Sequence, residues 1–395
     1  MELEDLNKEE SKHYKYVNNF FAKLNKYALE CSDSTKKFVS FTMNTLIEKK
    51  KELISNISEK GIPDDLPMLR AYIWKILLNL LPEDPSLWGE TLKKKRIEYH
   101  NYRELIEAKL KKEIEEKKYK SMAELEQIIK DAYRTNTNVP FFFEPTNKDN
   151  LQNDEEHLKQ LQKRKNCTVN SVNEIYYNEK EYELHVDVLK RILFIYTKFC
   201  ADISYHQGMN ELIAPIYYCF SYDKTYAYET HEDIEADTYW CFHYLMSQVG
   251  QSFVSANNEG IKIKSSIFFR CLKIVDIDIS NKLKELNIPK EYYCHKWFLL
   301  LFSQEFQLKD LLKIWDLIFS KEDIYYYVIY ISIAFLMLKR ETIVKGDMIL
   351  VLKEVGNYEN INIDELISKA KEIRKNYSGL LDDIILKTTE IINDA

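Results

Sequence analysis

The chain has 395 residues, 45% hydrophobic and 13% aromatic, so it is long and apolar enough to bury a large core and is not a disordered chain. Its formal net charge of −7 argues against broad binding to nucleic acid or to anionic membranes. The seven cysteines are odd in number and contain no CxxC pair, so they suggest neither a disulfide framework nor a zinc site.

Residues 1–60 are highly charged and repeat apolar side chains at helical spacing, which predicts an N-terminal helical extension. The acidic start of the chain lacks the apolar stretch of a signal peptide. The longest apolar run, Ile324 to Leu338, is shorter than the ~20 residues of a membrane-spanning helix and predicts a buried helix instead. We therefore expect a cytoplasmic protein without a transmembrane segment.

A helix with a thick apolar face is predicted after the break at Gly61-Ile62-Pro63, where glycine and proline interrupt the helical pattern. Apolar residues resume at Leu66 and continue to Pro82, where the helix should stop. Trp74 lies on the apolar face of this helix, and Trp315 lies on a similar face later in the chain. Both tryptophans are expected to be core residues.

The segment from Pro85 to Tyr119 predicts a long polar helix. The Lys93–Arg96 run on it is typical of a solvated helix face, with a partner-binding surface as the alternative. Ser121 and Glu124 have the spacing of a capping box, which predicts the start of the next helix at this point.

Arg134 lies in the predicted last turn of that next helix, which should end before Pro140. A cation there complements the negative end of the helix dipole, and Asp131, three residues earlier, is spaced to pair with it. The residues alone therefore favour a structural role for Arg134 over catalysis.

Residues 144–180 are rich in Asn, Lys, Gln and Glu and predict a polar surface insert. Helical patterns return after it and continue toward the C-terminus, and no segment has convincing strand periodicity. The prediction is an all-α protein, with one large multi-helix domain over residues 61–390.

Gln207 and Gly208 stand directly before a run of apolar residues at helical spacing. A glutamine at the start of a helix lies near unpaired N–H groups and the positive dipole end, which favour anions such as phosphate. The alternative is a glutamine that only closes a loop through its own backbone hydrogen bonds, and spacing alone favours this alternative.

Several kinds of catalytic site are excluded by the glycines and histidines. No two of the eight glycines lie within nine residues of each other, which excludes the GxxxxGK[ST], GxGxxG and GxSxG motifs. The histidines contain no HExxH motif. We therefore expect no metal, no bound cofactor and no turnover chemistry of the chain's own, and any chemistry should complete the site of another protein.

Three segments in chain order resemble a known signature: Gly61-Ile62-Pro63 with Arg70-x-x-x-Trp74, Asp131-x-x-Arg134-Thr135, and Tyr205-x-Gln207-Gly208-Met209. Together they resemble the TBC domain of GTPase-activating proteins for Rab GTPases. The later stretches around Trp297 and Trp315 resemble the C-terminal half of that domain. The longer spacing between Arg134 and Gln207 is explained by the insert at 144–180.

The resemblance implies that the chain activates GTP hydrolysis by a Rab GTPase in its GTP form, with Mg²⁺ and GTP held by the Rab. It implies that Arg134 is an arginine finger and Gln207 a glutamine finger. Asp131, Arg70, Trp74, Tyr205 and Gly208 would support these two side chains. The implied setting is vesicle trafficking, with recruitment to endomembranes through the Rab and no nucleic-acid partner.

Two alternatives remain open at this stage. A protein with the same fold can be a Rab-binding scaffold with weak catalysis, which the loss of either finger residue would favour. The motifs can also be packing features of an α-helical adaptor, which the lack of a Rab interaction would favour.

Overall fold

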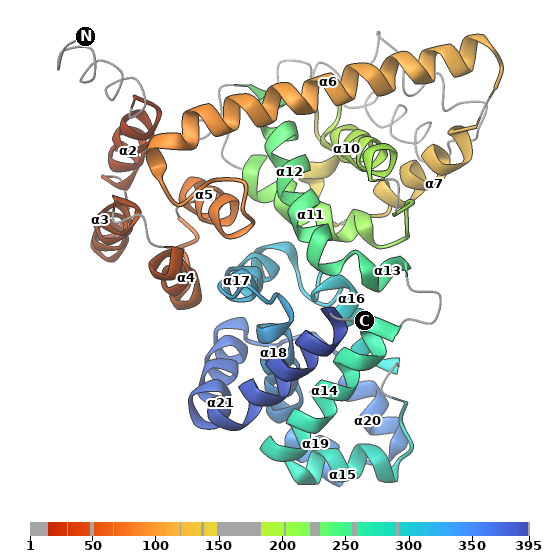
Figure 1. Cartoon of the computed structure of the whole chain (residues 1–395). Coiled ribbons are helices and arrows are strands. Elements are labelled where there is room, and N and C mark those ends of the chain that lie inside the picture. Colours follow the sequence, from red (N-terminus) through yellow and green to blue (C-terminus); the bar gives the residue numbers. More distant parts are fainter. Residues whose placement is uncertain are drawn as a thin grey trace. The chain divides into compact units, whose positions relative to one another are not determined.

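The computed structural model describes residues 15–29, 31–47, 51–65, 67–118, 120–135, 138–147, 183–200, 203–221, 230–254, 259–289 and 292–393. These residues form α-helices and two short 3₁₀ turns, and they include no strand (Figure 1). The predicted all-α class is thereby confirmed. The predicted insert at 144–180 lies outside the described residues from position 148 onward.

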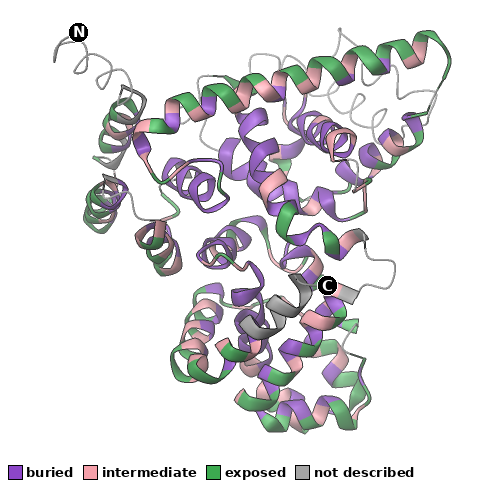
Figure 2. Ribbon diagram, viewed as in Figure 1, coloured by how far each residue is buried: buried purple, intermediate pink, exposed green. Residues whose placement is uncertain are grey.

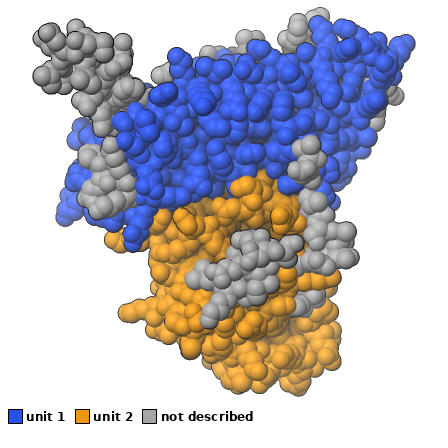
Figure 3. All heavy atoms as spheres, in the orientation of Figure 1, with its two compact units in different colours: residues 1–54, 63–245 blue, residues 55–62, 246–395 orange. Residues whose placement is uncertain are grey.

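The chain divides into two compact units (Figure 3). Unit 1 comprises residues 1–54 and 63–245, and unit 2 comprises residues 55–62 and 246–395. The division into an extension at 1–60 and a domain at 61–390 stays a prediction.

The helices of unit 1 precede residue 246, and α4 and α12 each run across a unit boundary. In chain order they are α2 (Lys15–Ala28), α3 (Asp33–Ile47), α4 (Lys51–Lys60), α5 (Pro67–Leu77), η1 (Pro85–Leu87), α6 (Trp88–Glu115), α7 (Met122–Ala132), η2 (Pro140–Phe143), α10 (His185–Phe199), α11 (Met209–Ser221) and α12 (His231–Val249).

The remaining helices belong to unit 2. They are α13 (Gln251–Val254), α14 (Glu259–Val275), α15 (Ile277–Glu285), α16 (Cys294–Leu300), α17 (Leu308–Phe319), α18 (Tyr325–Leu338), α19 (Arg340–Lys345), α20 (Met348–Val355) and α21 (Ile363–Asn393).

Helix α5 ends at Leu77, earlier than the predicted stop at Pro82. Asn79 has a positive φ of 58°, and the amides of Leu80 and Leu81 donate to the Lys75 carbonyl. A residue in the left-handed conformation after the last turn ends a helix, because it directs the amides that follow it toward carbonyls of the last turn. The asparagine therefore ends the helix before the proline is reached.

The capping box predicted at Ser121 is wrong. Ser121 has helical backbone angles and makes no capping hydrogen bond with its side chain. Its hydroxyl and its amide instead donate to the Glu113 carboxylate, at 3.2 Å and 3.1 Å. A carboxylate from the end of α6 competes for the serine, so the side chain joins two helices and does not cap one.

The interior of unit 2 is built around α18, whose residues are almost all buried (Figure 2). This helix packs along α21, α14 and α17. Trp315 in α17 is fully buried, and its indole donates to the Leu301 carbonyl at 2.8 Å. Trp74 in unit 1 is also fully buried, so the prediction that both tryptophans are core residues is confirmed.

A cluster of charges lies inside unit 1, where α5, α6 and α12 meet. The Lys75 ammonium lies 2.7 Å from Asp237, and both side chains are fully buried. Arg96 donates two hydrogen bonds to the same carboxylate, each of 3.0 Å. The predicted solvated face of the Lys93–Arg96 run holds for Lys93 and Lys94, which are exposed, but not for Arg96. The ammonium of its neighbour Lys95 lies 3.6 Å from the ring centre of Trp240.

Candidate functional site

The first segment of the candidate site is the C-terminal end of α7. Asp131 in its last turn is buried, and α7 ends one residue later. The Arg134 amide donates to the Asp131 carbonyl at 3.0 Å, which continues the turn beyond the helix. The Arg134 side chain is 74% exposed, and its guanidinium approaches the Asp131 carboxylate at 4.0 Å. The Arg134 side chain therefore extends into solvent from a backbone fixed by hydrogen bonds. The buried Asp131 carboxylate lies 4.0 Å from its guanidinium.

The second segment is the turn that precedes α11. Gly208 has a φ of +106°, a region that side chains disfavour, and α11 begins at the next residue. The Gly208 amide donates to the side chain of Asn210 at 3.0 Å, which holds the turn closed. Gln207 directly before it is exposed. The turn thus presents a glutamine to solvent at the start of a helix.

Hydrogen bonds join the two segments, although they are far apart in the sequence. The Tyr205 hydroxyl lies 3.1 Å from the Asp131 carboxylate. The Asn210 amide donates to the Thr135 hydroxyl at 2.7 Å, and that hydroxyl donates to the Asp131 carbonyl at 3.0 Å. Asp131, Thr135, Tyr205 and Asn210 therefore fix the end of α7 against the turn before α11.

Burial, and then the nearby Asp131, raise the pKa of Tyr205 well above its usual value. The phenol is therefore protonated at neutral pH, and its O–H donates a hydrogen bond to the Asp131 carboxylate. Such a charge-assisted hydrogen bond is stronger than one between neutral groups.

Further hydrogen bonds hold the Asp131 carboxylate and the turn before α11. Gln127, one helical turn before Asp131, donates to its carboxylate at 2.9 Å. The Tyr205 amide donates to Glu124 at 3.3 Å, and Glu124 also pairs with Lys198 of α10. The site segments are thus attached to α7 and α10 at several points.

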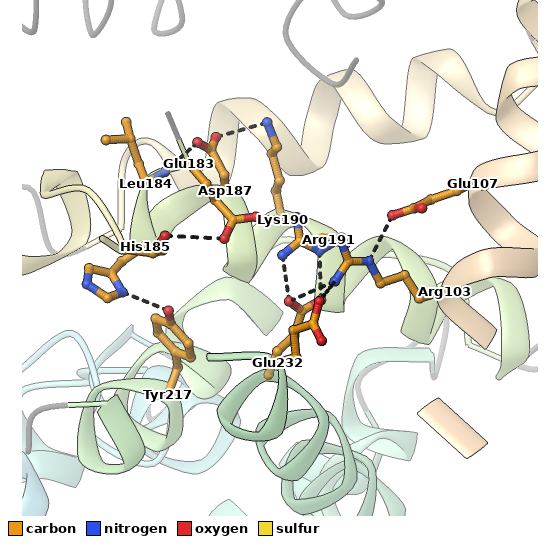
Figure 4. Close-up of polar contacts among 12 residues, drawn as sticks. Arg103, Glu107, Glu183, Leu184, His185, Asp187, Lys190, Arg191, Tyr217 and Glu232 are labelled. Carbon is orange, nitrogen blue, oxygen red and sulfur yellow. Dashed lines mark hydrogen bonds and ion pairs between the residues drawn. The ribbon is translucent and has the colours of Figure 1, made fainter. Parts of the chain in front are cut away.

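Helix α10, which packs against both α7 and α11, is held by a polar network (Figure 4). Its first turn is closed by Asp187, which accepts from the Leu184 amide at 2.9 Å. Arg191 pairs with Glu183 at 2.6 Å and with the buried Glu235 of α12 at 2.5 Å. Although burial opposes it, Arg191 holds the pKa of Glu235 below its usual value, so this carboxylate stays ionised.

Two of the predicted supporting residues belong to α5. Arg70 is buried in α5 and pairs with Asp64 at 2.9 Å. Trp74 lies fully buried in the same helix, which packs against α11. The structure thus brings together Asp131, Arg134, Tyr205, Gln207 and Gly208, and a supporting role for Arg70 and Trp74 stays a prediction.

Asn210 and Thr135 were not among the predicted site residues, although both are buried and join the two segments. One signal was present for Asn210. It is an asparagine in the first turn of α11, a helix whose other residues are mostly apolar and buried. A polar side chain at such a position requires a hydrogen-bond partner.

Within the described residues, no group of histidine, cysteine, aspartate or glutamate side chains is arranged to hold a metal ion. The same residues include no helix that combines the length and the apolar character needed to cross a bilayer.

Comparison with known proteins places residues 146–344 within the Rab-GTPase-TBC domain family. The chain is 31% identical over 377 residues to TBC1 domain family member 13 of Homo sapiens, covering 82% of this chain and 94% of the human protein. It is 23% identical to the GTPase-activating protein GYP1 of Saccharomyces cerevisiae, over 68% of this chain and 37% of the yeast protein.

Among solved structures, the Ypt/Rab-GAP domain of Gyp1p superposes with a TM-score of 0.65 at 20% identity. The superposition covers 88% of this chain and 99% of that domain, and it shows a shared fold. The similarity to the human protein, together with the family match over half of the chain, shows that this chain belongs to the Rab-GTPase-TBC domain family.

Proposed function

We propose that this protein is a GTPase-activating protein for a Rab GTPase and that Arg134 and Gln207 act together on the bound GTP. The observation that carries the proposal is the bonded pair of segments at Asp131–Thr135 and Tyr205–Asn210. Each segment has an exposed side chain of the type that phosphoryl transfer requires, a guanidinium on one and an amide on the other.

The guanidinium would neutralise the negative charge that builds on the transferring phosphoryl group. An arginine supplied in trans contributes about 10³–10⁵ in kcat in related GTPases. Arg134 suits this task because its backbone is fixed by the turn after α7 while its side chain stays exposed. An arginine bound in a full internal ion pair would have to break that pair first.

The amide of Gln207 would orient the attacking water. A glutamine does this by accepting a hydrogen bond from the water with its carbonyl and donating one with its amide nitrogen. Gly208 supports this position, because its positive φ lets the chain turn directly behind the glutamine. The first amides of α11 add partial positive charge on the same side.

The Rab would bring Mg²⁺ and GTP, so the chain itself would bind no cofactor and turn over no substrate of its own. We expect it to act on the GTP-bound Rab in vesicle trafficking. In this proposal it is a cytoplasmic protein that reaches endomembranes through the Rab.

The function is tested by measuring GTP hydrolysis for a panel of purified Rab GTPases with and without the full chain. We expect stimulated hydrolysis for at least one Rab. Binding to a GTP-loaded Rab without stimulated hydrolysis would support the alternative, a Rab-binding scaffold with the same fold. Neither binding nor stimulation across the panel would contradict both.

Replacement of Gln207 by alanine should reduce the stimulated rate by about 10² or more, because the attacking water would lose its orienting amide. The side chain is exposed, so the melting temperature should stay at the wild-type value. Single-turnover hydrolysis at saturating activator measures this effect. Gln248→Ala, another exposed glutamine, is the matched control and should keep full activity.

Asn210→Asp should separate the hydrogen bond that this side chain accepts from Gly208 from the one that it donates to Thr135. An aspartate still accepts from the Gly208 amide, but it has no N–H for the Thr135 hydroxyl. We expect kcat to fall by about 10-fold to 100-fold, because a small displacement of the paired side chains is costly in catalysis. The free energy of unfolding should fall by about 1–3 kcal/mol, the cost of an unmade buried hydrogen bond.

The matched partner variant is Thr135→Val, which removes the acceptor from the other side of the same bond. If the bond positions the two segments, the losses in kcat from Asn210→Asp and Thr135→Val should not add in the double variant. Additive losses would show that the two side chains act independently.

A further inference from the structure

Unit 2 contains a cavity of about 420 Å³ that is separate from the site described above. This volume lies within the range of about 300–1,000 Å³ typical of small-molecule sites. Its inner wall includes Ser252, Lys264, Ile267, Tyr325, Ile329 and Ile385. The exposed residues Gln248 and Glu322 lie at its rim. The cavity is thus lined by both polar and apolar side chains, and Lys264 is among them.

The Lys264 ammonium is held in place by two neighbours. It donates to the Ser252 hydroxyl at 3.1 Å and lies 3.5 Å from the centre of the Tyr325 ring. An ammonium has three N–H donors, so these neighbours leave hydrogen-bonding capacity toward the cavity. Within the described part of the chain, no carboxylate lies within ion-pairing distance of this nitrogen.

Burial lowers the pKa of Lys264 to about 8, with the nearby Asp323 opposing the change. Among the described residues, Asp323 acts on this partly desolvated ammonium only from beyond ion-pairing distance. A buried charge of this kind is costly unless an opposite charge compensates it. An anion in the cavity would supply that compensation.

The chemical class of the anion follows from the other walls. Ile267, Ile329 and Ile385 require an apolar body next to the charged group. Glu322 and Asp323 line the same cavity, and their carboxylates would repel a dianion more strongly than a monoanion. These walls favour a single negative charge over a dianion such as a phosphate monoester.

We propose that this cavity binds a small monocarboxylate with an apolar body, whose carboxylate accepts hydrogen bonds from Lys264. This site is independent of the proposed action on a Rab GTPase.

The proposal is tested by calorimetric titration of the full chain at pH 7 with 4-phenylbutyrate. The neutral 4-phenylbutanamide serves as a probe of nearly the same shape. The dianion 3-phenylpropyl phosphate serves as a probe with the same phenylpropyl body and a larger head group. We expect 4-phenylbutyrate to bind at least about tenfold more tightly than either, since a hydrogen bond to a charged group is worth that much. This comparison uses the wild-type protein and does not depend on the folding of any variant.

Lys264→Met should reduce binding of 4-phenylbutyrate by about tenfold or more, because it keeps the apolar stem and removes the charge. The Lys264→Met variant should also have a melting temperature no lower than that of the wild type, because the substitution removes a largely buried positive charge. Lys262→Met, at an exposed position of the same helix, is the matched control and should bind as wild type does.

Four results would overturn the inference. Equal affinity for the carboxylate and the amide would show that Lys264 does not select a negative charge. Tighter binding of the phosphate would contradict the assignment to a monoanion. No binding of 4-phenylbutyrate, or unchanged binding in Lys264→Met, would show that the cavity is not this carboxylate site.

Discussion

Arg134→Ala should lose about 10³-fold or more of the stimulated GTP hydrolysis on the best Rab, the effect of removing an arginine supplied in trans. Arg134→Lys should lose most of this activity as well. Lysine keeps the positive charge but lacks the planar fork that contacts two oxygens at once. Because the Arg134 side chain is 74% exposed, both variants should fold and melt like the wild type.

The measurement is single-turnover hydrolysis with the activator in excess, together with binding to the Rab in a transition-state mimic. Both Arg134 variants should bind that mimic more weakly than the wild type. The matched control is Arg270→Ala, an exposed arginine in unit 2 that should keep full activity. Stimulated hydrolysis that survives in Arg134→Ala and in Gln207→Ala would contradict the paired action of these residues and leave a Rab-binding scaffold.

Asp237→Ala should lower the free energy of unfolding by about 3–5 kcal/mol, the cost of breaking a buried ion pair by removing one partner. The carboxylate lies 2.7 Å from the Lys75 ammonium and accepts two hydrogen bonds from Arg96. Although burial opposes it, Lys75 and Arg96 hold the pKa of Asp237 below its usual value, so the group is ionised at neutral pH. The alanine variant would take this carboxylate away from the fully buried Lys75 ammonium, whereas Arg96 would keep its 3.2 Å ion pair with Asp233.

Urea unfolding followed by circular dichroism measures this loss. Adding Lys75→Met to Asp237→Ala should restore part of the stability, because it removes the fully buried cation that lost its partner. Glu341→Ala is the control, since Glu341 and its partner Lys345 are both largely exposed and such pairs contribute little. Wild-type stability in Asp237→Ala would contradict the buried cluster.

The sequence by itself determined the class of the fold and the positions of most helices. Apolar spacing predicted the buried helix at Ile324 to Leu338, which became α18. It succeeded because helical periodicity is a local property that each segment carries in its own residues. The order of the motifs also predicted the family, which similarity to known proteins confirms.

Local patterns were less reliable where a side chain distant in the sequence forms a hydrogen bond or an ion pair with the residue in question. The spacing of Ser121 and Glu124 predicted a capping box, but Glu113 takes the serine. The Lys93–Arg96 run predicted a solvated face, but Asp237 of α12 draws Arg96 into the interior. Such competition depends on which helices meet, and neighbours along the chain do not reveal it.

The candidate site could be predicted from the sequence only in part. The residue types at Asp131, Arg134 and Gln207 were visible in the sequence, as was the glycine that lets the chain turn at Gly208. Only the tertiary structure decided that Asn210 and Tyr205 bond to the end of α7. A hydrogen bond forms between atoms that the fold brings within about 3 Å, and sequence spacing carries no information about a separation across so many intervening residues.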